Sequence, residues 1–181
     1  MTLQRDDMSM ANLIASGLFG DGAAAVVGGG QRLRLARPEN SGYTLRLLSR
    51  YRRDDGVGMC RRRVFTSCSP RRSRIWFGGR WPMTSIAFLG DLGRSRRDVG
   101  SWIMHSGGPK VLQATASALG LEDGQLSASW DCLRRTGNLS SASVLVVLEV
   151  VRNNRRPAPG TLGLLAAMGP GFCSEWVALE W

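Results

Sequence analysis

The stretch that decides the fold is VGSWIMHSGGPKVLQATASALG, residues 99–120. Residues 99–104 are mostly apolar and predict a short buried strand that ends at His105. The turn-forming residues 106–109 follow, and Pro109 suits the first position of a helix that we expect to run to about residue 119. The next residue is a glycine, which typically ends a helix. The stretch therefore predicts a strand, a tight turn and a helix.

The remainder of the C-terminal part continues this alternation. We expect a helix over residues 139–152, with Asn138 as its N-cap, because its valines and leucines form a wide apolar face. Two strands follow, at residues 162–167 and around residues 175–179, and the tight turn 169–171 joins them. The order strand, helix, helix, strand, strand predicts a layered α/β fold.

The 181-residue chain divides into three zones of different composition. Within residues 1–30, two glycines precede residues 23–27, which predict a buried strand. Residues 31–87 show no sustained period of two or 3.6, so we expect this zone to be irregular. Residues 88–181 hold the regular pattern described above. With 43% apolar residues, the chain is long enough to form a globular core.

Positive charge is concentrated in the middle zone and the ten residues that follow it. The formal net charge is +10, and residues 31–97 contain 17 arginines against four acidic residues. The segment MCRRRVFTSCSPRRSRIW, residues 59–76, would suit a nucleic-acid partner. However, arginine outnumbers lysine 23 to 1 in the chain, whereas a surface selected for charge is expected to use both. Composition alone therefore does not establish nucleic-acid binding.

Other features restrict the class of protein. The chain has no run of 18 apolar residues, and its first ten residues lack the order of a signal peptide, so we expect a cytoplasmic protein without a membrane segment. The single histidine and the irregular spacing of the four cysteines indicate neither a zinc site nor a disulfide framework. We expect structural thiols and no metal or other cofactor.

Two polar residues occupy positions where catalytic groups commonly lie. His105 follows a predicted strand and Asn138 precedes a predicted helix. An imidazole and a side-chain amide can both donate hydrogen bonds to a carbonyl oxygen and stabilise negative charge on it. The alternative is that His105 is a core histidine and Asn138 a simple helix cap, and the spacing alone does not decide between the two.

Four motifs resemble, in order and rough spacing, the C-terminal half of type III polyketide synthases, the chalcone and stilbene synthase family. They are Gly-Leu-Phe-Gly-Asp-Gly-Ala-Ala-Ala at 17–25, His-Ser-Gly-Gly-Pro at 105–109, Gly-Asn-Leu-Ser-Ser-Ala-Ser at 137–143 and Gly-Pro-Gly at 169–171. The related β-ketoacyl carrier-protein synthases usually continue the histidine motif differently, which favours the polyketide branch. The resemblance implies a thiolase-like fold, with residues 1–30 and 88–181 belonging to the C-terminal domain.

The resemblance also implies an acyltransferase reaction, the decarboxylative condensation of malonyl-CoA onto a starter acyl thioester. His105 and Asn138 would be the catalytic pair that stabilises the enolate and polarises the thioester carbonyl. Substrate binding would involve four further residues, Ser140, Gly169, Pro170 and Gly171. Acyl-CoA thioesters would be the substrates, and family members are homodimers. Ser106 stands where the family generally has proline, which is expected to loosen the histidine loop.

The family's nucleophilic cysteine belongs to an N-terminal half that this sequence does not show, and neither Cys132 nor Cys173 has a matching context. A condensing enzyme without its nucleophile cannot load a starter group. We therefore expect the chain by itself to be inactive. A nucleic-acid-binding protein, a synthase of the β-ketoacyl carrier-protein type and a non-functional gene relic are the alternatives.

A change of reading frame would explain the middle zone. Each of residues 42–85 restricts the codon that encodes it, and these codons can be read in the two other frames. Read in this way, they can encode peptides that resemble the family, and the given sequence resumes the resemblance at Phe88. The peptides encoded in the other frames have the strand and helix periodicity that residues 42–85 of the given sequence lack. The hypothesis is that about residues 31–87 are translated out of frame, and nucleic-acid binding is then not expected.

Overall fold

The computed structural model describes residues 6–29, 32–34, 45–47, 52–54, 81–169 and 173–181. Its elements are α1 (Met10–Leu18), β1 (Val27–Gly29), β2 (Arg32–Arg34), β3 (Leu45–Leu47), β4 (Arg52–Asp54), α3 (Trp81–Gly90), the 3-10 turn η2 (Arg96–Asp98), β5 (Val99–Met104), α4 (Pro109–Leu119), α5 (Ser127–Thr136), the 3-10 turn η3 (Ser140–Ala142), α6 (Ser143–Asn154), β6 (Leu162–Gly169) and β7 (Cys173–Glu180).

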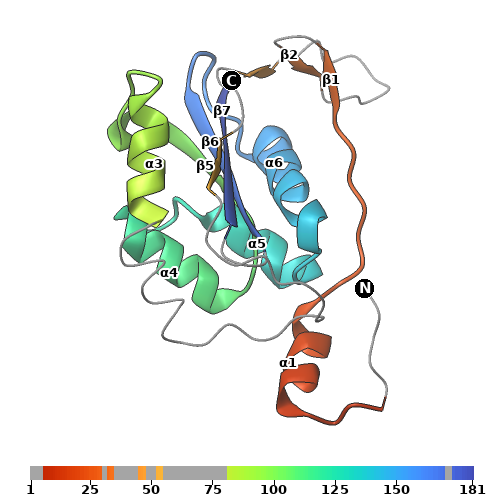
Figure 1. Cartoon of the computed structure of the whole chain (residues 1–181). Coiled ribbons are helices and arrows are strands. Elements are labelled where there is room, and N and C mark those ends of the chain that lie inside the picture. The colour runs from red at the N-terminus through yellow and green to blue at the C-terminus, as the bar shows by residue number, and fades with distance from the viewer. Residues whose placement is uncertain (1–5, 30–31, 35–44, 48–51, 55–80, 170–172) are drawn as a thin grey trace.

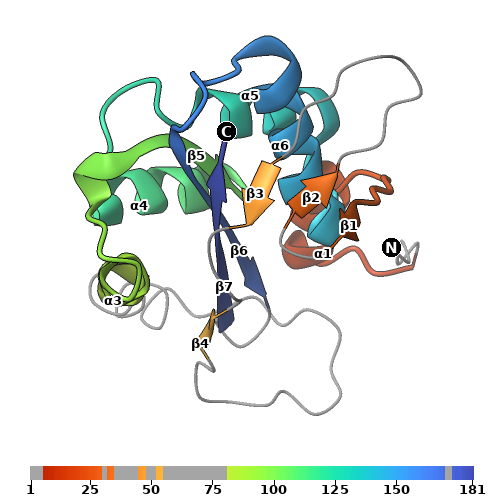
Figure 2. The same ribbon diagram turned by 90° about the horizontal axis from the view of Figure 1, so that it is seen from above.

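One mixed sheet organises the described chain (Figures 1 and 2). Its order is β1-β2-β3-β7-β6-β5, and β4 also pairs with β7. β5 runs parallel to β6, and Met104 pairs with Ala166, whereas β6 and β7 form an antiparallel hairpin. Because parallel neighbours need a crossover connection, the three helices α4, α5 and α6 fall between β5 and β6. The mixed α/β fold predicted from the sequence is confirmed.

Apolar side chains pack on both faces of the sheet. On one face, α3 and α4 cover alternate strand residues such as Trp102, Met104 and Trp176. On the other face, α6 and part of α5 cover Ile103 and Leu179. Neighbours in one strand thus enter different cores, as the twofold period of a strand requires. The result is a three-layer arrangement with the sheet between helices (Figure 1).

The decisive stretch folds as its sequence predicts. The strand β5 ends directly before His105, and α4 begins at Pro109. Gly120 ends α4 with φ 60°, a left-handed conformation that costs little without a side chain. The Arg96 guanidinium donates to the carbonyl of Leu119 at 2.6 Å, so a charged group satisfies one of the carbonyls left free at the helix end. The strands expected at residues 162–167 and 175–179 are also confirmed, as β6 and β7.

Helix α5 has no counterpart in the sequence prediction. Its sequence, SASWDCLRRT, is polar overall, and its buried face consists of the small residues Ala128, Ser129 and Cys132. A pattern of large apolar side chains is the usual sign of an amphipathic helix, and in α5 two such residues, the partly buried Trp130 and Leu133, pack against the core. The order is therefore strand, three helices and two strands, one helix more than expected. Helix α1 was likewise not predicted.

Asn138 does not cap α6, which begins at Ser143 with Ala142 as its N-cap. The 3-10 turn η3 comes between, and Ser140 at its start has φ 56°, which a regular α-helix cannot include. The prediction of an N-cap at Asn138 is therefore wrong for this helix. The side chain of Asn138 instead accepts a hydrogen bond from the N–H of Ser140 at 2.8 Å, which is the local bond of a turn.

The strand expected at residues 23–27 is also wrong, because regular pairing begins only at Val27 and Ala23 to Ala25 are exposed. An apolar run becomes a strand only where a neighbour offers backbone hydrogen bonds, and β1 finds its partner β2 from Val27 onward. Three short strands and the start of α3 fall within residues 31–87, which were expected to be irregular. The arginine-rich residues 59–76 lie outside the described part of the chain.

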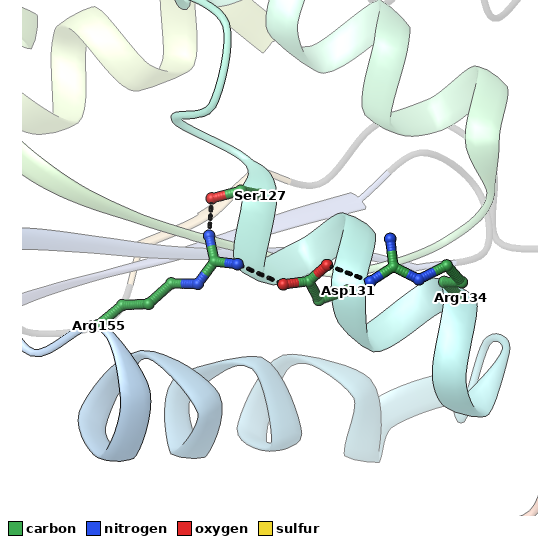
Figure 3. A network of polar contacts seen from close by, with 4 residues as sticks. All are labelled: Ser127, Asp131, Arg134 and Arg155. Atoms are coloured by element: carbon green, nitrogen blue, oxygen red, sulfur yellow. Dashed lines mark hydrogen bonds and ion pairs between the residues drawn. The ribbon is translucent and has the colours of Figure 1, made fainter.

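Polar contacts join α5 to the end of α6 (Figure 3). Arg155 follows α6, and its guanidinium donates to Ser127 Oγ and pairs with the carboxylate of Asp131, both on α5. Arg134 pairs with the other oxygen of Asp131 at 2.7 Å. Arg155 therefore connects the end of α6 to α5, whereas the Asp131–Arg134 pair lies within α5.

Candidate active site

His105 lies where β5 leaves the sheet. Its backbone N–H donates to the carbonyl of Ala166 in β6 at 2.9 Å, which fixes the position of the residue against the neighbouring strand. The ring is partly buried, and this burial lowers the pKa of His105 below its ordinary value of 6.5. Within the described residues, neither ring nitrogen has a hydrogen-bond partner, so the imidazole is free to meet a ligand and is neutral at pH 7.

Two glycines shape the loop that follows the histidine. A Cβ added to Gly107 would lie 3.4 Å from Cδ2 and 3.5 Å from Nε2 of His105. The bare backbone at this position therefore packs directly against the imidazole. Gly108 has φ 149°, which favours glycine, and its carbonyl accepts from Leu112 at 3.0 Å as α4 begins. The loop thus turns sharply behind the ring.

Asn138 reaches this loop from a distant part of the chain. Its Nδ2 donates to the carbonyl of Gly107 at 3.1 Å, and its Oδ1 accepts from the N–H of Ser140 and, at 3.4 Å, from Ser143 Oγ. The residue is 5% exposed. An amide nitrogen carries two hydrogens, and within the described residues one of them has no acceptor. The structure therefore brings Asn138 and the histidine loop together and leaves an N–H available.

The glycine-rich motif at 17–25 holds the asparagine from the other side. The N–H of Asn138 donates to the carbonyl of Leu18 at 2.8 Å, and its own carbonyl accepts from Gly20 at 3.1 Å. A Cβ on Gly20 would lie 2.2 Å from the carbonyl oxygen of Thr136, and one on Gly137 would lie 2.6 Å from that of Leu18. Such close approach between the two segments is possible only without side chains. Three of the four sequence motifs thus meet at one place.

The fourth motif is only partly described. Gly169 is the last residue of β6 and pairs with Cys173, whereas Pro170 and Gly171 lie outside the described residues. His105 contacts β6 at Ala166, three residues before Gly169, which corresponds to about 10 Å along a strand. Ser140 is exposed and lies two residues after Asn138 in the chain. The roles expected for these four residues stay predictions.

A shallow cavity of about 430 Å³ opens beside these motifs. Residues from the first motif, the histidine loop and the asparagine turn contribute to it, and its lining is formed by Gly17, Leu18, Pro109, Trp130, Leu133, Arg134 and Gly137. The volume is in the range of small-molecule sites. Arg134 is the charged member of this lining, and its guanidinium pairs with Asp131.

Sequence reasoning identified His105 and Asn138 but missed the groups that hold them. Cys132 contacts Ser106, and Ser143 contacts Asn138. The backbone of Leu18 and Gly20 also pairs with that of Asn138. The available signal was the glycine content of the first motif, which indicates close backbone contact. Cys132 is a free buried thiol, in agreement with the expectation of structural cysteines.

Two negative findings concern the described residues alone. None of the helices found there has the length and apolar character needed to span a bilayer. No group of three or more histidine, cysteine, aspartate or glutamate side chains among them is arranged to hold a metal ion.

Comparison with known proteins places these motifs in context. Residues 84–180 match the family model for chalcone and stilbene synthases, C-terminal domain. The chain is 46% identical to a 1,3,6,8-tetrahydroxynaphthalene synthase of Streptomyces peucetius subsp. caesius, an alignment that covers 100% of this chain and 48% of that protein. It is 30% identical to a 3,5-dihydroxyphenylacetyl-CoA synthase of Amycolatopsis orientalis, covering 97% of this chain and 48% of that protein. The chain thus spans about half the length of the curated relatives it matches.

A solved structure gives the same result for the fold. The crystal structure of PKS-I from the brown alga Ectocarpus siliculosus is similar with a TM-score of 0.64 and 26% identity, over 82% of this chain and 42% of that one. The similarity extends beyond the C-terminal zone, since it covers more residues than the family model matches.

Proposed function

Because the chain belongs to the chalcone and stilbene synthase family, we propose that it supplies the histidine and asparagine half of a type III polyketide synthase. The reaction is the decarboxylative condensation of malonyl-CoA with an acyl thioester, and the enzyme is an acyltransferase. The observation that carries the proposal is the 3.1 Å hydrogen bond from Asn138 Nδ2 to the Gly107 carbonyl, which joins the asparagine turn to the histidine loop.

The proposed chemistry assigns each group a role. The bond between the carboxylate and the α-carbon of malonyl-CoA breaks, carbon dioxide leaves, and the electron pair becomes an enolate. The negative oxygen then needs donors that are fixed before the reaction. The free N–H of Asn138 and a ring N–H of neutral His105 can provide them, since burial keeps the pKa of the imidazole low. The α-carbon attacks the acyl thioester, a carbon–carbon bond forms, and the thiolate leaves.

The nucleophilic thiol must come from elsewhere. In the family it belongs to the N-terminal half, and the relatives are about twice as long as this chain. Cys132 is buried against Ser106 and Thr136, so it is not placed to carry an acyl group. We expect the chain by itself to form no condensation product, and we expect acyl-CoA substrates and a homodimer once a complementary half is present.

The test supplies that half in trans. The N-terminal half of the Streptomyces relative, expressed separately, is mixed with the chain, and carbon dioxide release from malonyl-CoA is measured. Loss of one donor of an oxyanion site typically costs about 10²–10³ in rate. We therefore expect His105→Ala and Asn138→Ala to lower the rate by that order, while Ser117→Ala, on the exposed side of α4, leaves it unchanged. Equal rates for all four proteins would refute the proposal.

We also propose that about residues 31–87 are translated out of frame. The arginine excess and the absence of periodicity support this reading. Resequencing of the gene and its transcript tests it: an uninterrupted frame that encodes the written residues would contradict it. A titration with double-stranded DNA tests the alternative, because phosphate contacts by the arginines would give strongly salt-dependent binding. We expect no binding to DNA at physiological salt. We also expect the protein to be cytoplasmic.

A further inference from the structure

Three small polar residues lie on one face of α5. Ser129, Cys132 and Thr136 are spaced three and four residues apart, which places them in one row along a helix. Ser129 and Cys132 are buried. The row faces the end of β5 and the loop after it, where His105 is located. Each member contacts a residue close to His105 or to Asn138.

Ser129 holds the residue before the histidine. Its hydroxyl donates to the carbonyl of Met104 at 2.8 Å and accepts from the N–H of the same residue at 3.3 Å. β5 is the last strand in the sheet order, so its outer backbone groups have no further strand to pair with among the described residues. One serine therefore satisfies both backbone groups of Met104, which would be costly to leave unpaired in the interior.

Cys132 holds the residue after the histidine. Ser106 is fully buried, and its hydroxyl donates to Cys132 Sγ at 3.7 Å. The serine that departs from the family's proline was expected to loosen the loop. It instead gains a partner on α5, one helical turn from Ser129. His105 thus lies between two residues, Met104 and Ser106, that are both fastened to the same helix face.

The row continues toward the asparagine. Thr136 Oγ1 has one hydrogen, which it donates to the carbonyl of Cys132 at 2.9 Å. The thiol hydrogen of Cys132 can then point at Thr136 Oγ1, 3.6 Å away, while its sulfur accepts from Ser106. The hydroxyl of Ser106, the thiol of Cys132 and the hydroxyl of Thr136 can thus each donate to an acceptor on α5. Thr136 ends the helix two residues before Asn138, so the same helix sets the position of both candidate catalytic residues.

We propose that Ser129, Cys132 and Ser106 are positioning residues that fix the imidazole of His105 relative to Asn138. The catalytic purpose of this arrangement rests on the proposed function. The positioning itself does not, because it is a statement about the ring of His105 and can be measured without substrate.

The experiment uses the fact that the chain has one histidine. In NMR spectra of the full chain, a single pair of ring C–H resonances therefore reports on His105. We expect one sharp pair with a titration midpoint below 6.5 in the parent protein. Ser129→Ala and Cys132→Ala remove a bond on either side of the ring, so the lines should broaden or multiply and the midpoint should move up toward 6.5 as water reaches the ring.

Matched variants separate positioning from general loss of stability. Cys132→Ser keeps a donor and an acceptor at the same place and should restore the parent spectrum. Ser85→Ala removes another fully buried hydroxyl, one that donates to Pro82 within α3, and should leave the histidine signals unchanged. If Cys132→Ala does not fold, Ser106→Ala removes the same bond with a smaller change. Folded Ser129→Ala and Ser106→Ala variants with the parent midpoint and line shape would overturn the proposal.

A kinetic arm connects the proposal to catalysis. In the assay with the complementary half, Cys132→Ala should lower kcat for decarboxylation about tenfold and leave KM for malonyl-CoA unchanged, because misplacement of a catalytic group affects the transition state. An unchanged kcat would contradict the positioning role. If the parent protein shows no activity at all, the proposed function fails, and the NMR comparison still decides whether α5 positions His105.

Discussion

At the scale of single residues, the partial burial of His105 has a consequence for stability. Burial lowers the pKa of the folded protein's imidazole below 6.5, whereas the unfolded chain keeps the ordinary value. Between the two pKa values the unfolded state binds more protons, so stability rises with pH through this window. The contribution is fully present above pH 6.5 and is lost as the pH falls toward the folded pKa.

We therefore expect the free energy of unfolding, measured with urea, to fall between pH 7.5 and pH 5. A His105→Gln variant cannot titrate in this window and should show a smaller decrease. Asp98 is the internal reference, because its pKa is lowered by hydrogen bonds from Ser95 and its effect appears only below about pH 4. An equal decrease in both proteins would mean that His105 is not the group responsible.

Gly20 is required for backbone approach, and Gly17 offers a matched control. A Cβ on Gly20 would meet the carbonyl oxygen of Thr136 at 2.2 Å, whereas one on Gly17 in α1 would meet nothing within 4 Å. We expect Gly20→Ala to lower the free energy of unfolding by about 1–3 kcal/mol, as overpacking does. Gly17→Ala should raise it by about 0.5–1 kcal/mol, because alanine favours the helix. Thermal unfolding distinguishes the two, and similar shifts would contradict the close contact.

At the scale of helices and strands, Asp131 adds a polar contact to the apolar packing between α5 and α6 (Figure 3). The carboxylate pairs with Arg155 and Arg134, whose side chains are 41% and 71% exposed. Exposed pairs contribute little, so we expect Asp131→Ala to cost about 1 kcal/mol and Arg134→Ala no more than about 0.5 kcal/mol. Urea unfolding of Asp131→Ala, of Arg155→Ala and of the variant with both substitutions gives the coupling energy of the Asp131–Arg155 pair. The coupling should shrink in 1 M salt, and a salt-independent value would contradict this account.

The elements that sequence could predict are those with a simple periodic pattern. β5, α4, β6 and β7 have compact apolar runs and glycine or proline at their ends, and all four were predicted. Helix α5 was not, because small residues line its buried face and its stabilising bonds are to the backbone of another element. Such bonds depend on tertiary position, which no local pattern contains.

The candidate site shows the same limit. His105 and Asn138 could be named from motifs at element ends, and the Asn138 to Gly107 bond brings their two segments together. The N-cap at Asn138 was wrong because the positive φ of Ser140 delays the helix by a few residues. The supporting residues Ser129, Cys132 and Ser143 could not be found, since buried hydroxyls and thiols have no sequence signal that separates them from surface ones.

At the scale of the whole molecule, α1 stands apart from the three layers (Figure 1). Its outward side chains include Met10, Leu13 and Ile14, which are 71%, 49% and 61% exposed. Adjacent apolar side chains on one surface favour association with another protein surface. The relatives are about twice as long as this chain, so additional protein is available in them to cover such a helix.

The last prediction follows from that exposure. In the isolated chain, Ile14→Glu should change the free energy of unfolding by no more than about 0.5 kcal/mol, because the side chain contributes little to the core. It should also reduce concentration-dependent light scattering, since a charge replaces an exposed apolar group. Leu148→Ala is the contrasting variant: Leu148 is fully buried against the sheet, and its loss should cost about 2–5 kcal/mol without reducing scattering. If Ile14→Glu destabilises the chain as Leu148→Ala does, α1 is packed within the fold of the isolated chain. If scattering falls while stability is kept, its apolar face is what makes the chain associate, and the same variant should then weaken complementation by the N-terminal half.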